Sequence, residues 1–215
     1  MTHLPADIHT HHPGRPDAVL SLEATEALAL HASTAPQPFS LALHPWHLTG
    51  AQGVAAFEAA AATCAGDARL RAIGECGLDP AGPCDAAMQQ AAFLAALRTA
   101  RRLGLPTVVH CVRQWDAMQQ AVRAVWGPRG AHSAEADGCP IIVHGFRKGP
   151  ALATQLLAQG FSISLGEHFN PDVPILVPRG KLFAETDESA LPIADVRKNI
   201  YLRGGLIKEI NENEQ

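Results

Sequence analysis

Short apolar runs recur along the chain, and each is followed by polar or turn-forming residues, as expected of buried strands. These runs predict eight strands, the first leading into Asp7 and the others at residues 18–22, 39–43, 70–73, 107–109, 140–143, 161–165 and 181–184. Alanine-rich or amphipathic stretches predict helices at residues 25–32, 53–65, 85–103, 114–126 and 150–159, with a last helix within 195–210. Residues 127–138, which contain several glycines, are predicted to form a loop.

Strands that alternate with helices are typical of a parallel sheet, and eight such units predict a compact (β/α)8 barrel of the TIM type. No full helix fits between the first two strands, because Pro13, Gly14 and Pro16 occupy the short segment between them. Residues 171–178 are too rich in proline for a regular helix. We therefore expect a single domain over residues 1–215, with abbreviated early helices and a short C-terminal tail.

Composition narrows the class of protein. Hydrophobic residues make up 47% of the 215 residues and charged residues 18%, which is typical of a globular enzyme rather than a disordered chain. The net charge of −4 argues against a broad basic face for nucleic acid, but not against an enzyme that meets one or two phosphates through bound metal. No apolar run is long enough to span a membrane and no secretory leader is recognisable, so we expect a cytoplasmic protein. The cysteine count is odd, without a CxxC pair, which predicts reduced thiols rather than a disulfide framework.

Candidate metal ligands begin at Asp7-Ile8-His9-Thr10-His11, at the end of the first predicted strand. Residues two apart on a strand share a face, so Asp7, His9 and His11 are expected to point the same way. Similar residues follow at other predicted strand ends, at His44, Glu75, His110, His144 and Asp187. The steps from 44 to 75, 75 to 110 and 110 to 144 are 31, 35 and 34 residues, each about one βα unit. In a barrel these strand ends converge on one mouth, which predicts a divalent-metal site there.

At these residues the chain resembles the TatD-related metal-dependent deoxyribonucleases, within the amidohydrolase-like barrels. Six motifs, in the family's order, support the resemblance: Asp-Ile-His-Thr-His at 7–11, Leu-His-Pro-Trp-His at 43–47, Ile-Gly-Glu-Cys-Gly-Leu-Asp at 73–79, Val-Val-His-Cys at 108–111, Val-His-Gly-Phe at 143–146 and Glu-Thr-Asp at 185–187.

The resemblance implies two divalent metal ions, Mg, Mn or Zn. His9, His11 and Asp187 would hold one ion, His110 and His144 the other, and Glu75 would bridge them. Asp187 would be the general base, and His44 would lie by the scissile phosphate rather than bind metal. The catalytic residues implied are thus Asp187, Glu75 and His44.

Other polar residues also lie near the predicted strand ends. Arg113, Arg147 and Lys148 follow ligand-bearing strands and are candidates for phosphate contacts, with ordinary solvated charges as the alternative. Asp79 either orients a ligand or caps a loop. Asp7 is expected to be a hydrogen-bond partner behind the histidines. Trp46 could stack a base at the mouth, although packing is the default for a lone tryptophan.

Three functions remain open from the sequence. The first is a phosphodiesterase, a deoxyribonuclease acting on DNA or another phosphodiester that it contacts locally at the metal site. The second is a small-molecule ester, amide or lactone hydrolase, in which water activated at the same site attacks a carbonyl. The third is a metal-binding protein without catalysis.

Overall fold

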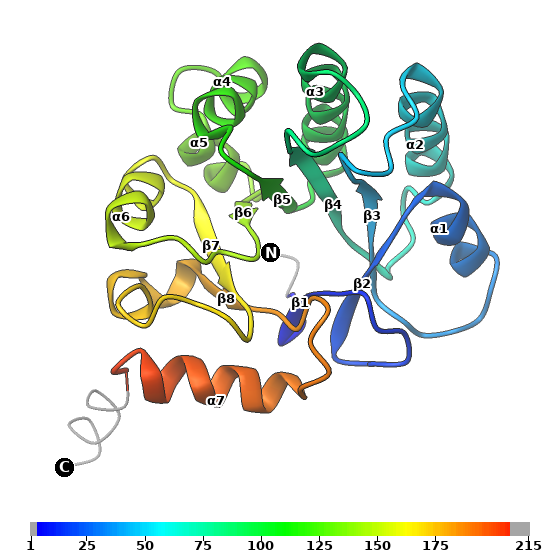
Figure 1. Ribbon diagram of the computed structural model, residues 1–215. Coiled ribbons are helices and arrows are strands. Elements are labelled where there is room, and N and C mark those ends of the chain that lie inside the picture. Colours follow the sequence, from blue (N-terminus) through cyan, green and yellow to red (C-terminus); the bar gives the residue numbers. More distant parts are fainter. Residues whose placement is uncertain (1–3, 207–215) are drawn as a thin grey trace.

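Eight parallel strands form one sheet in the order of the sequence, as the computed structural model shows for residues 4–206, the part of the chain that it describes. Each strand pairs with the next one along the chain, so that the sheet curls into a barrel (Figure 1). The strands are β1 (Asp7–Thr10), β2 (Ala18–Leu22), β3 (Phe39–Leu43), β4 (Leu70–Leu78), β5 (Thr107–Cys111), β6 (Ile141–Val143), β7 (Ser162–Leu165) and β8 (Leu182–Ala184). This confirms the predicted TIM-type (β/α)8 barrel.

Helices surround the sheet on its outside (Figure 1). They are α1 (Ala24–His31), α2 (Ala51–Thr63), α3 (Ala86–Leu103), α4 (Trp115–Trp126), α5 (Ala131–Ala136), α6 (Pro150–Ala158) and α7 (Ile193–Arg203), with short 3-10 turns at η1 (Pro174–Leu176) and η2 (Arg179–Lys181). The predicted last helix begins as expected, and its residues 207–210 lie outside the described part.

Two local predictions were wrong. Residues 127–138 were predicted as a loop, but they contain α5, because the glycines at 127, 130 and 138 lie around an alanine-rich turn rather than within it. The strand predicted at 70–73 continues to Leu78, since its Gly, Glu and Cys residues pair with β5 despite their low strand propensity.

The backbone of Asp187, just after the last strand, closes the barrel by hydrogen bonds to the first strand and the residue that follows it. Asp187 N donates to His9 O at 3.0 Å, and His11 N donates to Asp187 O at 3.1 Å. Thr10 and Asp187 form the corresponding parallel bridge. Because the closure runs through Asp187 itself, it fixes this carboxylate beside the two histidines of β1.

Two sets of apolar side chains support the sheet. Ile8, Ala72, Val108 and Ile142, from β1, β4, β5 and β6, form a small buried cluster of their own. A larger core includes Phe57 of α2 and Phe93 and Leu97 of α3, all buried. Burial of this apolar surface is the main driving force for folding and holds the strand ends that carry the site in place.

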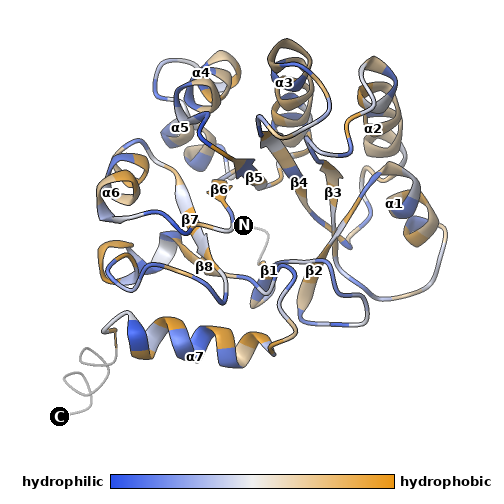
Figure 2. Cartoon of the chain, viewed as in Figure 1, coloured by the Kyte–Doolittle hydropathy of each residue, from blue (hydrophilic) through white to orange (hydrophobic). Residues whose placement is uncertain are grey.

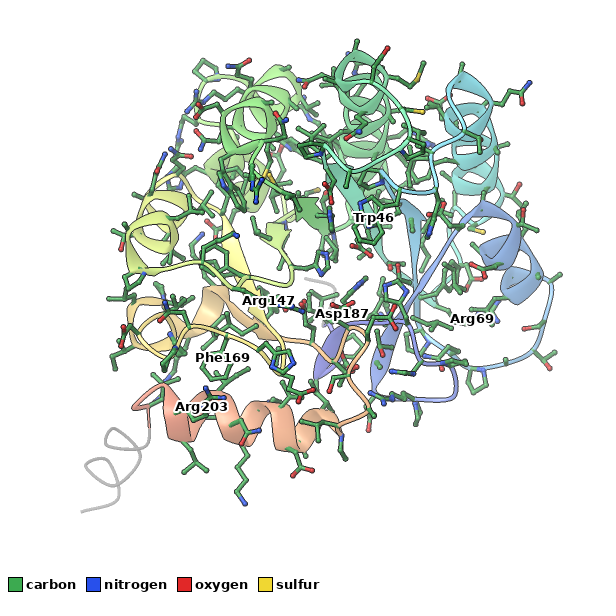
Figure 3. All side chains as sticks on the ribbon, viewed as in Figure 1. Trp46, Arg69, Arg147, Phe169, Asp187 and Arg203 are labelled. Carbon is green, nitrogen blue, oxygen red and sulfur yellow. The ribbon has the colours of Figure 1, made fainter. Side chains whose placement is uncertain are left out.

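The helical cover is uneven around the barrel. β3–β6 are flanked by α2–α5, whereas β1 and β2 are joined without a helix, and β7 and β8 only through η1 and η2. Figure 2 shows hydrophobic and hydrophilic residues side by side along α7, which lies against β8. Its end is held by the guanidinium of Arg203, 5.1 Å from the centre of the Phe169 ring (Figure 3). None of the helices in residues 4–206 is both long and apolar enough to span a membrane.

Candidate metal centre

Five histidines converge on the carboxylate of Glu75, which is only 4% exposed. His9 Nε2 and His11 Nε2 lie 3.4 and 3.3 Å from its Oε2 atom. On the other side, Oε1 lies 2.8 Å from His144 Nε2 and 3.0 Å from both His44 Nε2 and His110 Nδ1. Each oxygen of this carboxylate therefore faces its own group of imidazoles.

Irregular strand pairing brings these side chains inward. The register of β1 on β2 shifts between Asp7 and Thr10, and that of β4 on β5 shifts between Ile73 and Cys76. Such irregularities re-aim side chains next to active sites. His9 and His11 thereby reach Glu75, whereas Asp7 does not.

The glycine that follows Glu75 and Cys76 has a steric reason. A Cβ atom on Gly77 would lie 1.9 Å from the carbonyl oxygen of His110, so no side chain fits there. The Gly-Glu-Cys-Gly sequence thus lets β4 approach the backbone of β5 and bring Glu75 and His110 together.

Asp187 lies beside the histidines of β1. Its Oδ1 atom is 3.8 Å from His9 Nε2 and 3.7 Å from His11 Nε2, and its side chain is 24% exposed. Its backbone has a φ of 51°, in the left-handed region that Asp tolerates better than most residues. This conformation and the barrel closure leave a carboxylate at the open edge of the cluster.

A second carboxylate fixes the orientation of His110. Asp79 Oδ2 lies 2.9 Å from His110 Nε2 and accepts a hydrogen bond of 2.8 Å from Trp46 Nε1. The pKa of Asp79 is lowered because hydrogen bonds from Ala81 N, His110 and Trp46 outweigh the effect of burial. As an ionised carboxylate only accepts, neutral His110 carries its proton on Nε2 and turns an Nδ1 lone pair towards Glu75.

Glu185 has a similar position behind His144. It is fully buried, accepts a hydrogen bond from Gly145 N, and lies 3.5 Å from His144 Nδ1. That separation is too long for a well-formed hydrogen bond, so the interaction is electrostatic. The charge of His144 holds the pKa of Glu185 below its usual range, although burial alone would raise it.

His44 differs from the other four histidines. Its Nδ1 atom accepts a hydrogen bond of 3.1 Å from Trp46 N, so neutral His44 carries its proton on Nε2. That proton points towards Glu75 and the mouth. This tautomer makes His44 a hydrogen-bond donor there, whereas a metal ligand would need the Nε2 lone pair.

The electrostatics of the cluster favour a positive partner for Glu75. Burial alone would raise the pKa of Glu75, but the charge of His144 and the hydrogen bond from His11 hold it well below its usual range. The hydrogen bond with Glu75 likewise raises the pKa of His11. Protons and divalent cations would therefore compete for the same imidazoles.

The residues present fit divalent cations. Both ring nitrogens of His9 are fully buried without a hydrogen-bond partner, which is costly unless another partner is bound. His9, His11 and Glu75 each offer a ligand atom within 4.8 Å of the others, and so do His9, His144 and Asp187. Nitrogen and carboxylate donors at such spacing suit Zn²⁺, Mn²⁺ or, with added water, Mg²⁺.

The family model described as TatD related DNase matches residues 18–199. The chain belongs to the TatD-related DNase family. Membership indicates a metal-dependent hydrolase, and the buried histidine and glutamate cluster is compatible with that class. The match begins after residues 7–11, so the place of His9 and His11 in the site rests on their distances to Glu75.

Solved structures agree with a TatD-like fold. YjjV, a TatD homolog from Escherichia coli K12, superposes with a TM-score of 0.65 at 20% identity, over 94% of this chain and 97% of that chain. A TatD family hydrolase from Entamoeba histolytica gives 0.60 at 16% identity, over 86% of this chain and 74% of that chain. An uncharacterized amidohydrolase from Saccharomyces cerevisiae gives 0.56 at 17%, over 79% and 63%. Among curated proteins, a search with this sequence finds no match.

The TatD-like chain has a large cleft of about 640 Å³ in front of the cluster. The cleft extends from the histidines over Leu20 and Leu22 of β2 towards Glu23 and Glu26 at the start of α1. A side cavity of about 170 Å³ lies towards β7 and β8, with Arg147, Glu167 and His168 in its lining. Asp187 and Glu188 line both spaces.

All six residues expected to hold metal lie together: His9, His11, Glu75, His110, His144 and Asp187. The cations expected near phosphate are more scattered. All three are exposed, but Arg147 lines the side cavity, whereas Arg113 and Lys148 line neither space. Asp7 accepts hydrogen bonds from Thr186 N at 3.0 Å and Thr186 Oγ1 at 2.7 Å, as a partner behind the site.

Sequence reasoning missed the role of Glu185. Its only signal was its place in Glu-Thr-Asp, next to Thr186 and Asp187, and nothing in the sequence linked it to His144. Glu23 was also missed. It accepts a hydrogen bond from His44 N at 3.1 Å and lies 3.4 Å from His47 Nδ1, so it holds the loop that presents His44.

Proposed function

We propose that this chain is a metal-dependent phosphodiesterase that hydrolyses DNA or a related phosphodiester at the C-terminal mouth of the barrel. The observation that supports it most is the arrangement of imidazoles on both oxygens of the buried Glu75, with Asp187 at its open edge. In this proposal His9, His11 and Asp187 would hold one divalent ion, His110 and His144 would hold the other, and Glu75 would serve both.

When bound, the ions would offset negative charge on the phosphoryl oxygens and lower the pKa of water. The protein's own groups do the rest. Asp187 accepts the proton of the attacking water, because its carboxylate is partly exposed whereas that of Glu75 is almost fully enclosed. His44 donates its Nε2 proton to the phosphoryl or leaving oxygen. Asp79 and Glu185 hold His110 and His144 in the orientation that the reaction needs.

The test combines metal content with nuclease activity on one purified sample. We expect about two ions per chain, and release of nucleotides from single-stranded DNA with Mn²⁺ or Mg²⁺. The Asp187→Asn variant and the His9→Ala/His11→Ala variant should lose this release. Asp17→Asn, the same change at an exposed position of β1–β2, is the matched control and should retain it. Equal release by wild type and Asp187→Asn would show contamination and refute the proposal.

A small-molecule ester, amide or lactone hydrolase is the second candidate. The observation that favours it is the charge of the large cleft, whose described lining contains Glu23, Glu26 and Glu188 but neither Lys nor Arg. A long polyanion gains little from such a surface. Full metal content with turnover on a panel of esters and lactones, and none on DNA, would favour this candidate.

A further inference from the structure

Two spaces of opposite character meet at the candidate metal centre. The large cleft and the side cavity share Asp187 and Glu188. A substrate bound at Asp187 can therefore extend into the cleft on one side and into the cavity on the other. Figure 3 shows Trp46 and Arg147 on different sides of Asp187. The chemistry of the two spaces therefore bears on which parts of a substrate enter them.

The large cleft suits an uncharged ring system. Leu20, Leu22 and Ala42 give it apolar lining, and Trp46, which is 53% exposed, lines it as well. The indole is held in place by its hydrogen bond to Asp79, so an aromatic ring can stack on it without first ordering it. Glu23 and Glu26 at the far end would repel a further phosphate.

The side cavity suits an anion despite its acidic neighbours. Arg147 lines it and has neither an ion pair nor a hydrogen bond to any of residues 4–206. Three of the four carboxylates in its lining already have partners: Glu167 accepts a hydrogen bond of 2.6 Å from Ser189 Oγ, Glu185 lies against His144 and Gly145, and Asp187 faces His9 and His11. The fourth, Glu188, is exposed to solvent. An unpaired guanidinium in a cavity of about 170 Å³ matches a phosphate in size and charge.

We propose that these spaces are two subsites for one substrate. The large cleft receives a nucleobase or similar ring against Trp46, and the side cavity receives a second anionic group, next to the scissile phosphodiester, against Arg147. This inference rests on the proposed phosphodiesterase function and adds the substrate class: a short phosphodiester with one neighbouring phosphate, rather than a long polyanion gripped along its length.

The test uses the metal-loaded protein and three thymidine dinucleotides: one with only its internal phosphodiester, one with an added 5′-phosphate and one with an added 3′-phosphate. We expect one added phosphate to lower KM about tenfold in the wild type, the usual gain from a charge-assisted hydrogen bond. Arg147→Gln should abolish this gain, so that KM for the three dinucleotides lies within about twofold of one another. Arg98→Gln, on the exposed face of α3, is the charge-matched control and should keep the gain.

Variants of Trp46 test the other subsite. Trp46→Leu should raise KM for all three dinucleotides. Trp46→Phe should keep KM closer to the wild-type value, because a ring remains for stacking. An added phosphate without effect in the wild type, or a gain that survives in Arg147→Gln, would overturn the subsite inference while the phosphodiesterase stands. A wild type that hydrolyses none of the three would overturn the proposed function and this inference with it.

Discussion

The two halves of the barrel contribute to the site in different ways. β3–β6 are backed by α2–α5 and contribute Glu75 from within β4, His110 from near the end of β5 and His144 from just after β6. β7, β8, β1 and β2 have two connections without an α-helix, yet they contribute His9, His11 and Asp187. In the first half, packed helices hold the strand ends. In the second, backbone hydrogen bonds between β1 and the segment after β8 hold them.

This difference shows that a side chain of the site can be positioned by sheet closure alone. Asp187 is fixed by hydrogen bonds from its own N–H and to its own carbonyl, so it needs no helix behind it. Glu75, in contrast, is central to both halves, since each of its oxygens faces imidazoles from a different set of strands. Substitutions in the two halves should therefore have effects of different size.

Glu75→Gln should have the largest effect, because it removes the group that both halves share. The amide keeps one oxygen, but its NH2 group has no lone pair to offer a cation, so it cannot serve both sides of the cluster as the carboxylate does. We expect turnover to fall about a thousandfold, within the range for loss of an essential acid–base or charged group, together with metal content. Steady-state kinetics and metal analysis measure this. Glu58→Gln, exposed on α2, should change neither, and an active Glu75→Gln would contradict the bridging role.

Substitution of the carboxylates behind His110 and His144 compares one supporting residue from each half, since Asp79 follows β4 and Glu185 follows β8. Asp79→Asn acts on His110 through a contact of 2.9 Å, and Glu185→Gln acts on His144 through one of 3.5 Å. Both should weaken metal binding, within the range of about 10- to 100-fold for such partners, and Asp79→Asn should lie nearer the upper end. Calorimetric titration with Mn²⁺ gives the two affinities. If Glu185→Gln weakened metal binding more than Asp79→Asn did, the length of the contact would not determine the size of the effect.

Metal affinity should fall with decreasing pH, and the raised pKa of His11 gives the sign. A protonated imidazole cannot bind metal, and the hydrogen bond with Glu75 raises the pKa of His11 above 6.5. Protons therefore compete with the metal already above pH 6.5, where a free histidine is mostly neutral. We expect affinity to drop by up to about tenfold per pH unit for each proton displaced. Mn²⁺ titrations from pH 8 to 6 check this, with proton release measured in two buffers; pH-independent affinity would refute it.

Much of this arrangement could be predicted from the sequence, and the reason is physical. The candidate site residues recur at the length of a βα unit because parallel strands of one barrel end at one mouth, so His44, Glu75, His110 and His144 were predictable in order. The contacts behind them were not. Whether Asp79 meets His110, or Glu185 meets His144, depends on loop paths that no local pattern specifies. The sequence did not predict α5, because glycines that flank a short helix cannot be distinguished, in sequence, from glycines of a loop.

We expect the smallest effect from a substitution at the junction where the two halves of the barrel meet. Arg69, before β4, donates hydrogen bonds to the carbonyl oxygens of Leu30, His31, Ser33 and Ala35, and is itself paired with Asp67 at 2.8 Å (Figure 3). It thus joins the covered half to the segment between α1 and β3.

Asp67→Asn should therefore lower the free energy of unfolding at pH 7 by at most about 1 kcal/mol, as for other ion pairs near a surface. Hydrogen bonds from Arg69 outweigh burial and hold the pKa of Asp67 well below 3.8. A lowered pKa in the folded state stabilises it above pH 3.8, and this stabilisation is lost as pH falls through the folded-state pKa. The wild-type and Asp67→Asn unfolding curves should then differ at pH 7 and converge in strong acid. A difference that persisted there would show that Asp67 acts through packing rather than through its charge.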